Sequence, residues 1–222
     1  LLRKRRQYAK WGNLIGLGML FGGLFTVARS PALSATLLLV GVVAAGVGSY
    51  MASRYVREPR ADQLLAKALD GLDKRYTLYS YYLPADHTVF SHHGFTVIDT
   101  RPQTGTIVYA NGRWSHRTRF RWLKQLVGEP ALVSPEKDLD ADISALQTWI
   151  AKQGLGVEIP IHGVIVFTNE NARLNIQGLR YPAVTLSELP DLLRAGMGDQ
   201  APLSTGQRRE IESLLDELVH KA

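Results

Sequence analysis

The sequence predicts an α/β domain, built on a mixed β-sheet flanked by helices, that follows an N-terminal α-helical transmembrane hairpin. The first 60 residues contain two long apolar stretches with almost no charge. In residues 61–222, helical patterns of apolar residues alternate with short runs of β-branched and aromatic residues. Helices and strands mixed in this way are typical of a sheet with helices packed on its faces. We therefore expect a hairpin in residues 1–60 and one α/β domain in residues 61–222.

The two apolar stretches, residues 11–28 and about 32–56, each have the length of a membrane span. A spanning helix needs about 20 predominantly apolar residues. Because only Arg29, Ser30 and Pro31 lie between the stretches, the two helices must form a tight antiparallel hairpin.

Basic residues flank the outer ends of this hairpin. Five precede the first stretch and three flank the end of the second, whereas the turn contains Arg29 alone. The positive-inside rule then places both termini and the α/β domain in the cytoplasm. The sequence thus predicts a protein integral to the inner or cell membrane, with the lipid bilayer as its first partner.

The net charge of +6 comes from these flanks. Residues 1–60 contain nine basic residues and one acid, Glu58, which gives +8 and leaves −2 for residues 61–222. The high pI is therefore no argument for a nucleic-acid-binding domain. The chain has no cysteine, which excludes disulfides and cysteine-ligated metal centres.

Small residues recur at spacings of four in both apolar stretches. Gly18 and Gly22 form one such pair, and Gly41 and Ala45 form another. Small residues at this spacing let helix backbones approach closely in lipid. Two interpretations stay open: these rows seal the hairpin on itself, or one of them docks the helix of a partner in a membrane-protein complex.

The sequence of the α/β domain predicts the order of its helices and strands. An amphipathic helix from Ala61 to about Gly71 is followed by a strand, a turn and a strand centred on residues 95–99. The pair Asn111-Gly112 is a strong hairpin signal between residues 105–109 and 113–116. The remaining predictions are helices at 138–153, 186–194 and 204–220, and strands at 163–169, 173–177 and 183–186.

Residues 113–124 interleave basic and aromatic side chains. This set includes Trp114, Arg117, Arg119, Arg121 and Trp122. Such a segment suits anionic headgroups beside a membrane anchor, a protein-docking surface, or nucleic acid, whose phosphates take basic residues and whose bases stack on aromatics.

The densest polar set surrounds two acids, Asp86 and Asp99. Asp86 opens one predicted strand and Asp99 closes its hairpin partner, so the two carboxylates could converge at one end of the sheet and hold a divalent cation. Alternatively, both are strand-end acids that face solvent. His92 and His93 are adjacent and read as turn residues, and without cysteine or a His-x-x-x-His pair they do not predict a zinc site.

The run LPADHTVFSHHGFTVIDTRPQTGTIVYANGRW resembles the core of the NERD, or nuclease-related, domain. Two later runs, VEIPIHGVIVFTNENARLNI and PAVTLSELPDLL, resemble the later strand and the closing helix of that family, so the resemblance covers residues 62–195. It implies a restriction-endonuclease-like fold of the PD-(D/E)xK type, in which two acids hold Mg²⁺ and a lysine positions the attacking water. It places the first acid at Asp86, the second at Asp99 and the lysine position at Arg101.

This sequence departs from the family pattern at several of these positions. Asp99 stands where the family has Glu, and Arg101 stands where it has Lys and cannot act as a base. The helical Glu of the family falls on Gln63, next to Asp62. These departures favour a degenerate site without a cofactor, and Mg²⁺ is expected only if the site is active.

Three functions from different classes follow. The first is a membrane-anchored, catalytically degenerate nuclease-related domain that acts as a binding or structural module. The second is an accessory subunit of a larger integral membrane complex. The third is an active Mg²⁺-dependent nuclease.

Overall fold

A computed structural model describes residues 2–55, 59–117, 132, 134–155, 159–197 and 202–221. The chain divides into two compact units. The first contains the residues up to Arg60, and the second contains the described residues from Ala61 onward.

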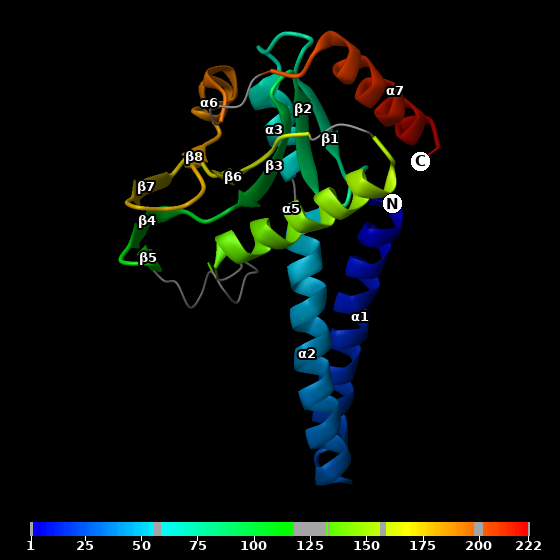
Figure 1. Ribbon diagram of the computed structural model, residues 1–222. Coiled ribbons are helices and arrows are strands. Elements are labelled where there is room, and N and C mark those ends of the chain that lie inside the picture. The colour runs from blue at the N-terminus through cyan, green and yellow to red at the C-terminus, as the bar shows by residue number, and fades with distance from the viewer. Residues whose placement is uncertain are drawn as a thin grey trace. The chain divides into compact units, whose positions relative to one another are not determined.

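The first unit is an antiparallel pair of helices, α1 (Leu2–Thr26) and α2 (Pro31–Tyr55) (Figure 1). Pro31 occupies the first position of α2, where its fixed φ suits a helix and its missing amide removes no helical hydrogen bond. Near the turn, the Ser34 hydroxyl donates to the Gly23 carbonyl oxygen at 2.7 Å and joins the two helices. The predicted hairpin is therefore present.

Small residues set the separation of the two helices. A Cβ added to Gly16 would lie 2.5 Å from the backbone nitrogen of Ala45, and one added to Gly41 would lie 3.0 Å from the Leu20 side chain. Contacts this short leave no room for a side chain at Gly16. Gly41 and Ala45 thus lie in the helix contact, as their spacing predicts.

Gly18 and Gly22 do not carry this contact. A Cβ on Gly18 would meet nothing within 4 Å, and one on Gly22 would only reach the Leu37 side chain at 4.0 Å. Two interpretations were open for such rows, and the contact that closes the hairpin is made by Gly16 and Gly23, which α1 presents to α2.

Length and composition support one of the two predicted spans. Pro31–Gly48 of α2 is long and apolar enough to cross a membrane, whereas the apolar part of α1 is the shorter stretch Leu14–Thr26. At about 1.5 Å per residue that stretch rises roughly 20 Å, less than the roughly 30 Å of a hydrocarbon core. Signal sequences and buried core helices also have the length and composition of the α2 stretch.

The second unit is built on a five-stranded mixed sheet with the order β1-β2-β3-β6-β8. The first three strands form an antiparallel meander, β6 runs parallel to β3, and β8 runs parallel to β6. A mixed sheet agrees with the predicted fold class. The strands are β1 (Thr77–Ser80), β2 (His87–Ser91), β3 (Gly94–Arg101), β6 (Ile161–Phe167) and β8 (Ala183–Thr185).

A separate three-stranded sheet has the order β5-β4-β7. Asn111 and Gly112, with φ of 52° and 72°, form the predicted tight turn between β4 (Gly105–Ala110) and β5 (Arg113–Arg117). β7 (Ala172–Ile176) pairs in parallel with β4. The sequence predicts these strands but not that they leave the first sheet, because alternation identifies a strand without identifying its partner.

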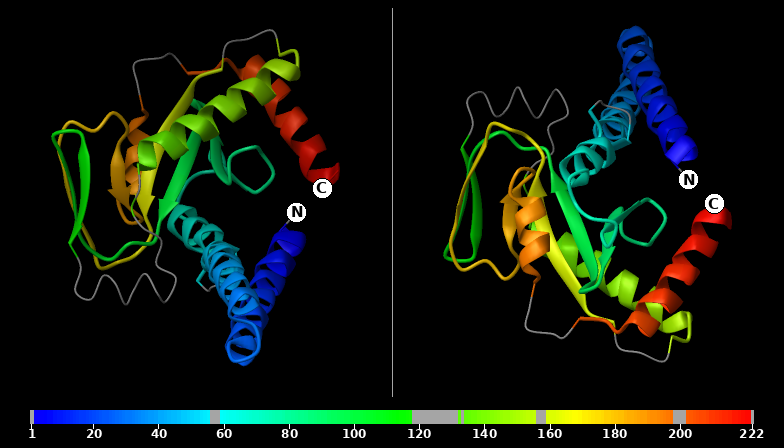
Figure 2. Two further views of the ribbon diagram at one scale, coloured as in Figure 1. Left: turned by 90° about the horizontal axis from the view of Figure 1, so that it is seen from below. Right: turned by 90° about the horizontal axis from the view of Figure 1, so that it is seen from above.

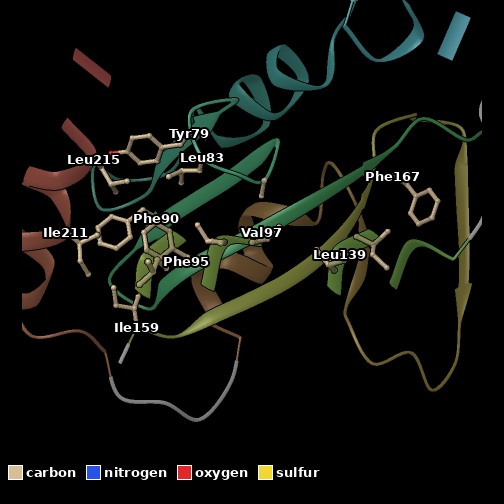
Figure 3. Packing of buried hydrophobic residues seen from close by; sticks show 14 of the residues in the cluster. Tyr79, Leu83, Phe90, Phe95, Val97, Leu139, Ile159, Phe167, Ile211 and Leu215 are labelled. Carbon is tan, nitrogen blue, oxygen red and sulfur yellow. The ribbon is translucent and has the colours of Figure 1, made fainter. Parts of the chain in front are cut away.

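Helices cover both faces of the five-stranded sheet (Figure 2). On one face, α5 (Pro135–Lys152) and α7 (Thr205–Lys221) contribute Leu139, Leu146, Ile211 and Leu215 to a core around Phe90, Phe95 and Phe167 (Figure 3). On the other face, α3 (Ala61–Leu69) and α6 (Leu189–Ala195) bury Leu65 and Leu189 against Val89, Ile98 and Val164.

Gly163 lets α5 approach the sheet. A Cβ there would lie 2.8 Å from Leu139 Cδ2 and 2.9 Å from Ile143 Cδ1. The backbone of β6 is therefore packed directly under the apolar side of α5, which fixes the start of that helix near the end of β3.

Candidate functional site

The candidate site lies at the carboxyl end of β3. Asp99 and Arg101 are two residues apart on this strand, so their side chains share one face of the sheet. Val97, also on that face, belongs to the core under α5. The Asp99 carboxyl is therefore placed at the edge of an apolar core, and its side chain is only 5% exposed.

Arg101 makes an ion pair with each of two acids. Its Nε donates to Asp99 Oδ2 at 2.6 Å, and its Nη2 donates to Asp138 Oδ2 at 2.6 Å. The guanidinium side chain is 11% exposed, whereas Asp138, in the first turn of α5, is 62% exposed. Arg101 thus joins the end of β3 to the start of α5, where the helix dipole also favours an acid.

Asp86 lies just before β2 and is half-buried. The register pairs Thr88 with Val97, so continuing it by two residues places the backbone of Asp86 opposite Asp99. The Asp86 carbonyl oxygen accepts a hydrogen bond from the Tyr81 amide at 2.7 Å, and Tyr81 has a φ of 67°. The two acid positions therefore lie toward the same end of the β2–β3 hairpin, and a metal site that they share stays a prediction.

His87 opens β2 and is nearly fully buried. Its Nδ1 lies 3.0 Å from the Ser80 hydroxyl, and its ring meets the Tyr81 ring edge to face at 5.0 Å. Strand alternation directs His87 to the face opposite Asp86. His87 therefore supports the turn before β2.

The other polar residues of the predicted set lie elsewhere. Asp62 and Gln63 are on α3, whose Leu65 packs on the face of the sheet opposite Asp99. His92 and His93 form the turn between β2 and β3, as predicted, with ring centroids 3.9 Å apart. This turn is at the far end of the hairpin from Asp86 and Asp99.

The arrangement at Asp99 does not fit a magnesium ion. A Mg²⁺ site needs carboxylate oxygens that are open to the metal and its waters. Asp99 is buried, and one of its oxygens already accepts a hydrogen bond from the Arg101 guanidinium, which stays charged at any ordinary pH. Within the described residues, no group of three or more acidic, histidine or cysteine side chains is placed to hold a metal ion.

The basic and aromatic segment after β4 is only partly described. Arg117 is exposed at the end of β5, whereas Arg119, Arg121 and Trp122 lie outside the described residues.

Trp114, which the sequence predicts to lie on a contact surface, is partly buried. Its Nε1 donates to Glu136 Oε2 at 3.3 Å, its ring packs against Tyr109, and it packs against the core under α5. Trp114 therefore joins the three-stranded sheet to the rest of the domain, because the alternation of β5 turns this side chain inward.

Asp138 is the one residue of this arrangement that the sequence did not single out. It is 37 residues from Arg101 and belongs to a predicted helix rather than to the polar set around Asp86. The sequence feature that could have identified it is the group of three acids in the first turns of α5, Glu136, Asp138 and Asp140. Helix N-termini commonly carry acids for reasons of stability alone, so this feature does not predict a site.

One family model matches the chain. Its description is nuclease-related domain (NERD), and the match covers residues 54–168, slightly more than half of the sequence. Asp86, Asp99, Arg101 and Asp138 all lie inside it. Residues 169–195, which the resemblance also included, lie outside it. No curated protein and no solved structure matches the chain.

Proposed function

The chain belongs to the nuclease-related domain (NERD) family, and from this membership we propose that it is a membrane-anchored, catalytically degenerate member that acts as a binding or structural module. The observation that carries the proposal is the ion pair between Arg101 and the buried Asp99.

This ion pair removes negative charge that a nuclease site needs in order to attract a metal ion. In a two-acid site the carboxylates attract the metal, and the metal stabilises charge on the phosphate. Here the guanidinium neutralises Asp99 and is itself held by Asp138. Because the two pairs fix Arg101 on both sides, a metal would have to displace a bound cation from a buried carboxylate.

Anchoring in a membrane is supported by α2 and by charge. α2 is long and apolar enough to cross a bilayer, and basic residues cluster in residues 1–10 and near residue 57. Extraction with alkaline carbonate tests this: we expect the full chain to stay with the membrane. Its release into the soluble fraction would contradict the anchor. Because the chain has no cysteine, single cysteines near residue 3 and residue 216 will report, by labelling, whether both termini face the cytoplasm.

Metal binding tests the loss of catalysis. Calorimetry with Mg²⁺ and Mn²⁺ on the full chain in mild detergent is expected to show no binding that depends on Asp86. Millimolar or tighter binding that disappears in Asp86→Ala would contradict the proposal and favour an active nuclease. As a matched comparison, Arg101→Lys restores the family residue, and we expect it to bind Mn²⁺ better than the natural chain does.

A role as an accessory subunit is the second candidate. Gly18 lies at an open position on α1, where a helix of another protein would find room for close approach. Purification in mild detergent separates the candidates, because an accessory subunit must leave the membrane in a stable complex of fixed stoichiometry, whereas the binding module need not.

A further inference from the structure

A second feature of the α/β domain lies at the other end of the β2–β3 hairpin from Asp99. An open pocket of about 370 Å³ is present between the hairpin turn, the segment before β1 and the start of α7. The turn and Asp99 are at opposite ends of β3, a strand of eight residues, so this pocket is separate from the candidate nuclease site. The pocket is lined by Arg75, His92, Leu203, Thr205, Arg208, Arg209 and Glu212.

Arginine dominates this lining. Arg75 is held by Asp73, with Nε 2.9 Å from Asp73 Oδ2, and Arg208 Nε donates to Glu212 Oε1 at 2.7 Å. These contacts orient two guanidinium groups and leave other N–H donors on both. Arg209 is exposed and pairs with no acid in the part of the chain that the structure describes. The pocket therefore has an excess of positive charge.

The start of α7 adds donors to the same pocket. Ser204 caps the helix: its hydroxyl accepts from the Gln207 amide at 3.3 Å, and its own amide donates to Gln207 Oε1 at 2.9 Å. The amides of Thr205 and Gly206 precede the first intrahelical bond and point out of the helix end. Thr205 lines the pocket, so the amino end of α7 borders the space that an anion would occupy.

The charge of this first turn is unusual for a helix N-terminus. It contains no acid, although acids there are stabilising, and two arginines follow directly. Cations at this end interact unfavourably with the helix dipole. A bound anion would offset this unfavourable interaction, which would explain why two arginines occupy these positions.

His92 forms part of the pocket wall. Its Nδ1 is buried without a hydrogen-bond partner in the described part of the chain. Burial, His93 and Arg75 lower the pKa of His92. Because its Nδ1 is closed to solvent, His92 contributes to the wall of the pocket and not to the contacts of a bound anion.

We propose that this pocket binds a phosphate group, either as inorganic phosphate or as the phosphate of a nucleotide. Guanidinium groups match phosphate geometry with paired N–H donors, and helix amides with the aligned dipole favour a dianion. This inference goes beyond the proposed function, since it concerns neither Asp99 nor the hairpin.

Binding of inorganic phosphate and of a nucleoside 5′-monophosphate to the full chain in mild detergent tests it by calorimetry. We expect Arg209→Gln to weaken both about tenfold, the size of one charge-assisted contact. Arg173→Gln is the matched control, because Arg173 is exposed on β7 in the other sheet and should leave binding unchanged. If the nucleoside 5′-monophosphate binds more tightly than inorganic phosphate, the natural ligand is a nucleotide. If the two bind equally, the natural ligand is inorganic phosphate.

A second variant, which is expected to strengthen phosphate binding, tests whether misfolding explains the loss of binding in Arg209→Gln. Glu212→Gln removes the acid that competes for Arg208, so phosphate should bind several-fold more tightly, and a merely structural role would not produce this gain. Absence of phosphate binding at millimolar concentration overturns the proposal. Binding that is equal in the natural chain, Arg209→Gln and Glu212→Gln overturns it as well.

Discussion

Arg101 matters most at the scale of single residues, because it compensates a buried charge. Removing one partner of a buried ion pair leaves the other charge uncompensated, which costs roughly 3–5 kcal/mol. We expect Arg101→Ala to lower the free energy of unfolding by about 3 kcal/mol, measured by urea denaturation followed by tryptophan fluorescence.

Asp138 is the control for this prediction. It pairs with the same guanidinium but is 62% exposed, so Asp138→Ala should cost no more than about 1 kcal/mol. Equal losses in the two variants would show that burial of Asp99 is not what makes the pair important.

His162, near the start of β6, predicts a dependence of stability on pH. Burial is the main cause that lowers its pKa below 6.5, His93 adds to this, and a backbone hydrogen bond with His93 opposes it. The folded state then binds fewer protons than the unfolded state, so its contribution is present above pH 6.5 and is lost as the pH falls below that value.

Urea midpoints at pH 7.5 and pH 5.5 measure this effect. We expect a lower midpoint at pH 5.5 and a smaller difference between the two in His162→Gln. His220→Gln, at an exposed position on α7, should leave the difference unchanged. A pH difference that survives in His162→Gln would assign it to other groups.

The individual residues of the candidate site were only partly predictable. Asp99 and Arg101 are two apart on a strand, so a shared face follows from the pleat alone. Their pairing with Asp138 depends on where α5 crosses the sheet, and no spacing in the sequence encodes a contact between residues 37 positions apart.

Among the elements, the hairpin offers the sharpest test. A leucine at Gly16 has no space, because its Cβ would be 2.5 Å from the backbone of α2, whereas a leucine at Gly18 meets open space. We expect Gly16→Leu to separate the helices and Gly18→Leu to leave them in contact.

Crosslinking measures the separation. The chain has no cysteine, so cysteines introduced at Gly12 and Gly48, where the two helices approach closely, can be joined by a short bis-maleimide. Crosslinking should fall in Gly16→Leu alone. Equal yields in Gly16→Leu and Gly18→Leu would contradict the helix contact described here.

The hairpin also shows that the spacing of small residues does not determine which face of a helix makes the contact. α1 contains glycines at positions 12, 16, 18, 22 and 23, so pairs four residues apart occur on more than one face. Spacing alone cannot choose between those faces. The choice of Gly16 over Gly18 follows from the partner side chains on α2, which a pattern in α1 does not contain.

On the scale of the whole molecule, each unit has its own packing. Both core clusters of the α/β domain, which include Phe95 and Ile98, are formed by residues after Ala61. We therefore expect a fragment of residues 61–222 to fold, with a cooperative unfolding transition seen by far-UV circular dichroism. A fragment that unfolds without a transition would show that the hairpin is needed for folding.

The overall architecture was predictable in its class and not in its division into two sheets. Amphipathic helices, the Asn111-Gly112 turn and the apolar run of β6 all identify their elements. The parallel pairing of β4 with β7 joins Gly105 to Ala172 across a long crossover, and such pairings carry no local signal.

The position of α7 in the core has a consequence for the order of events during synthesis. Ile211 and Leu215 complete the cluster around Phe90 and Phe95, so the domain cannot close its core until the chain has been made to that point. Tyr55 ends the hairpin about 160 residues earlier, which at roughly 5–20 residues per second is some 8–32 s of translation. The helical hairpin is therefore complete while the core of the α/β domain still lacks its last helix.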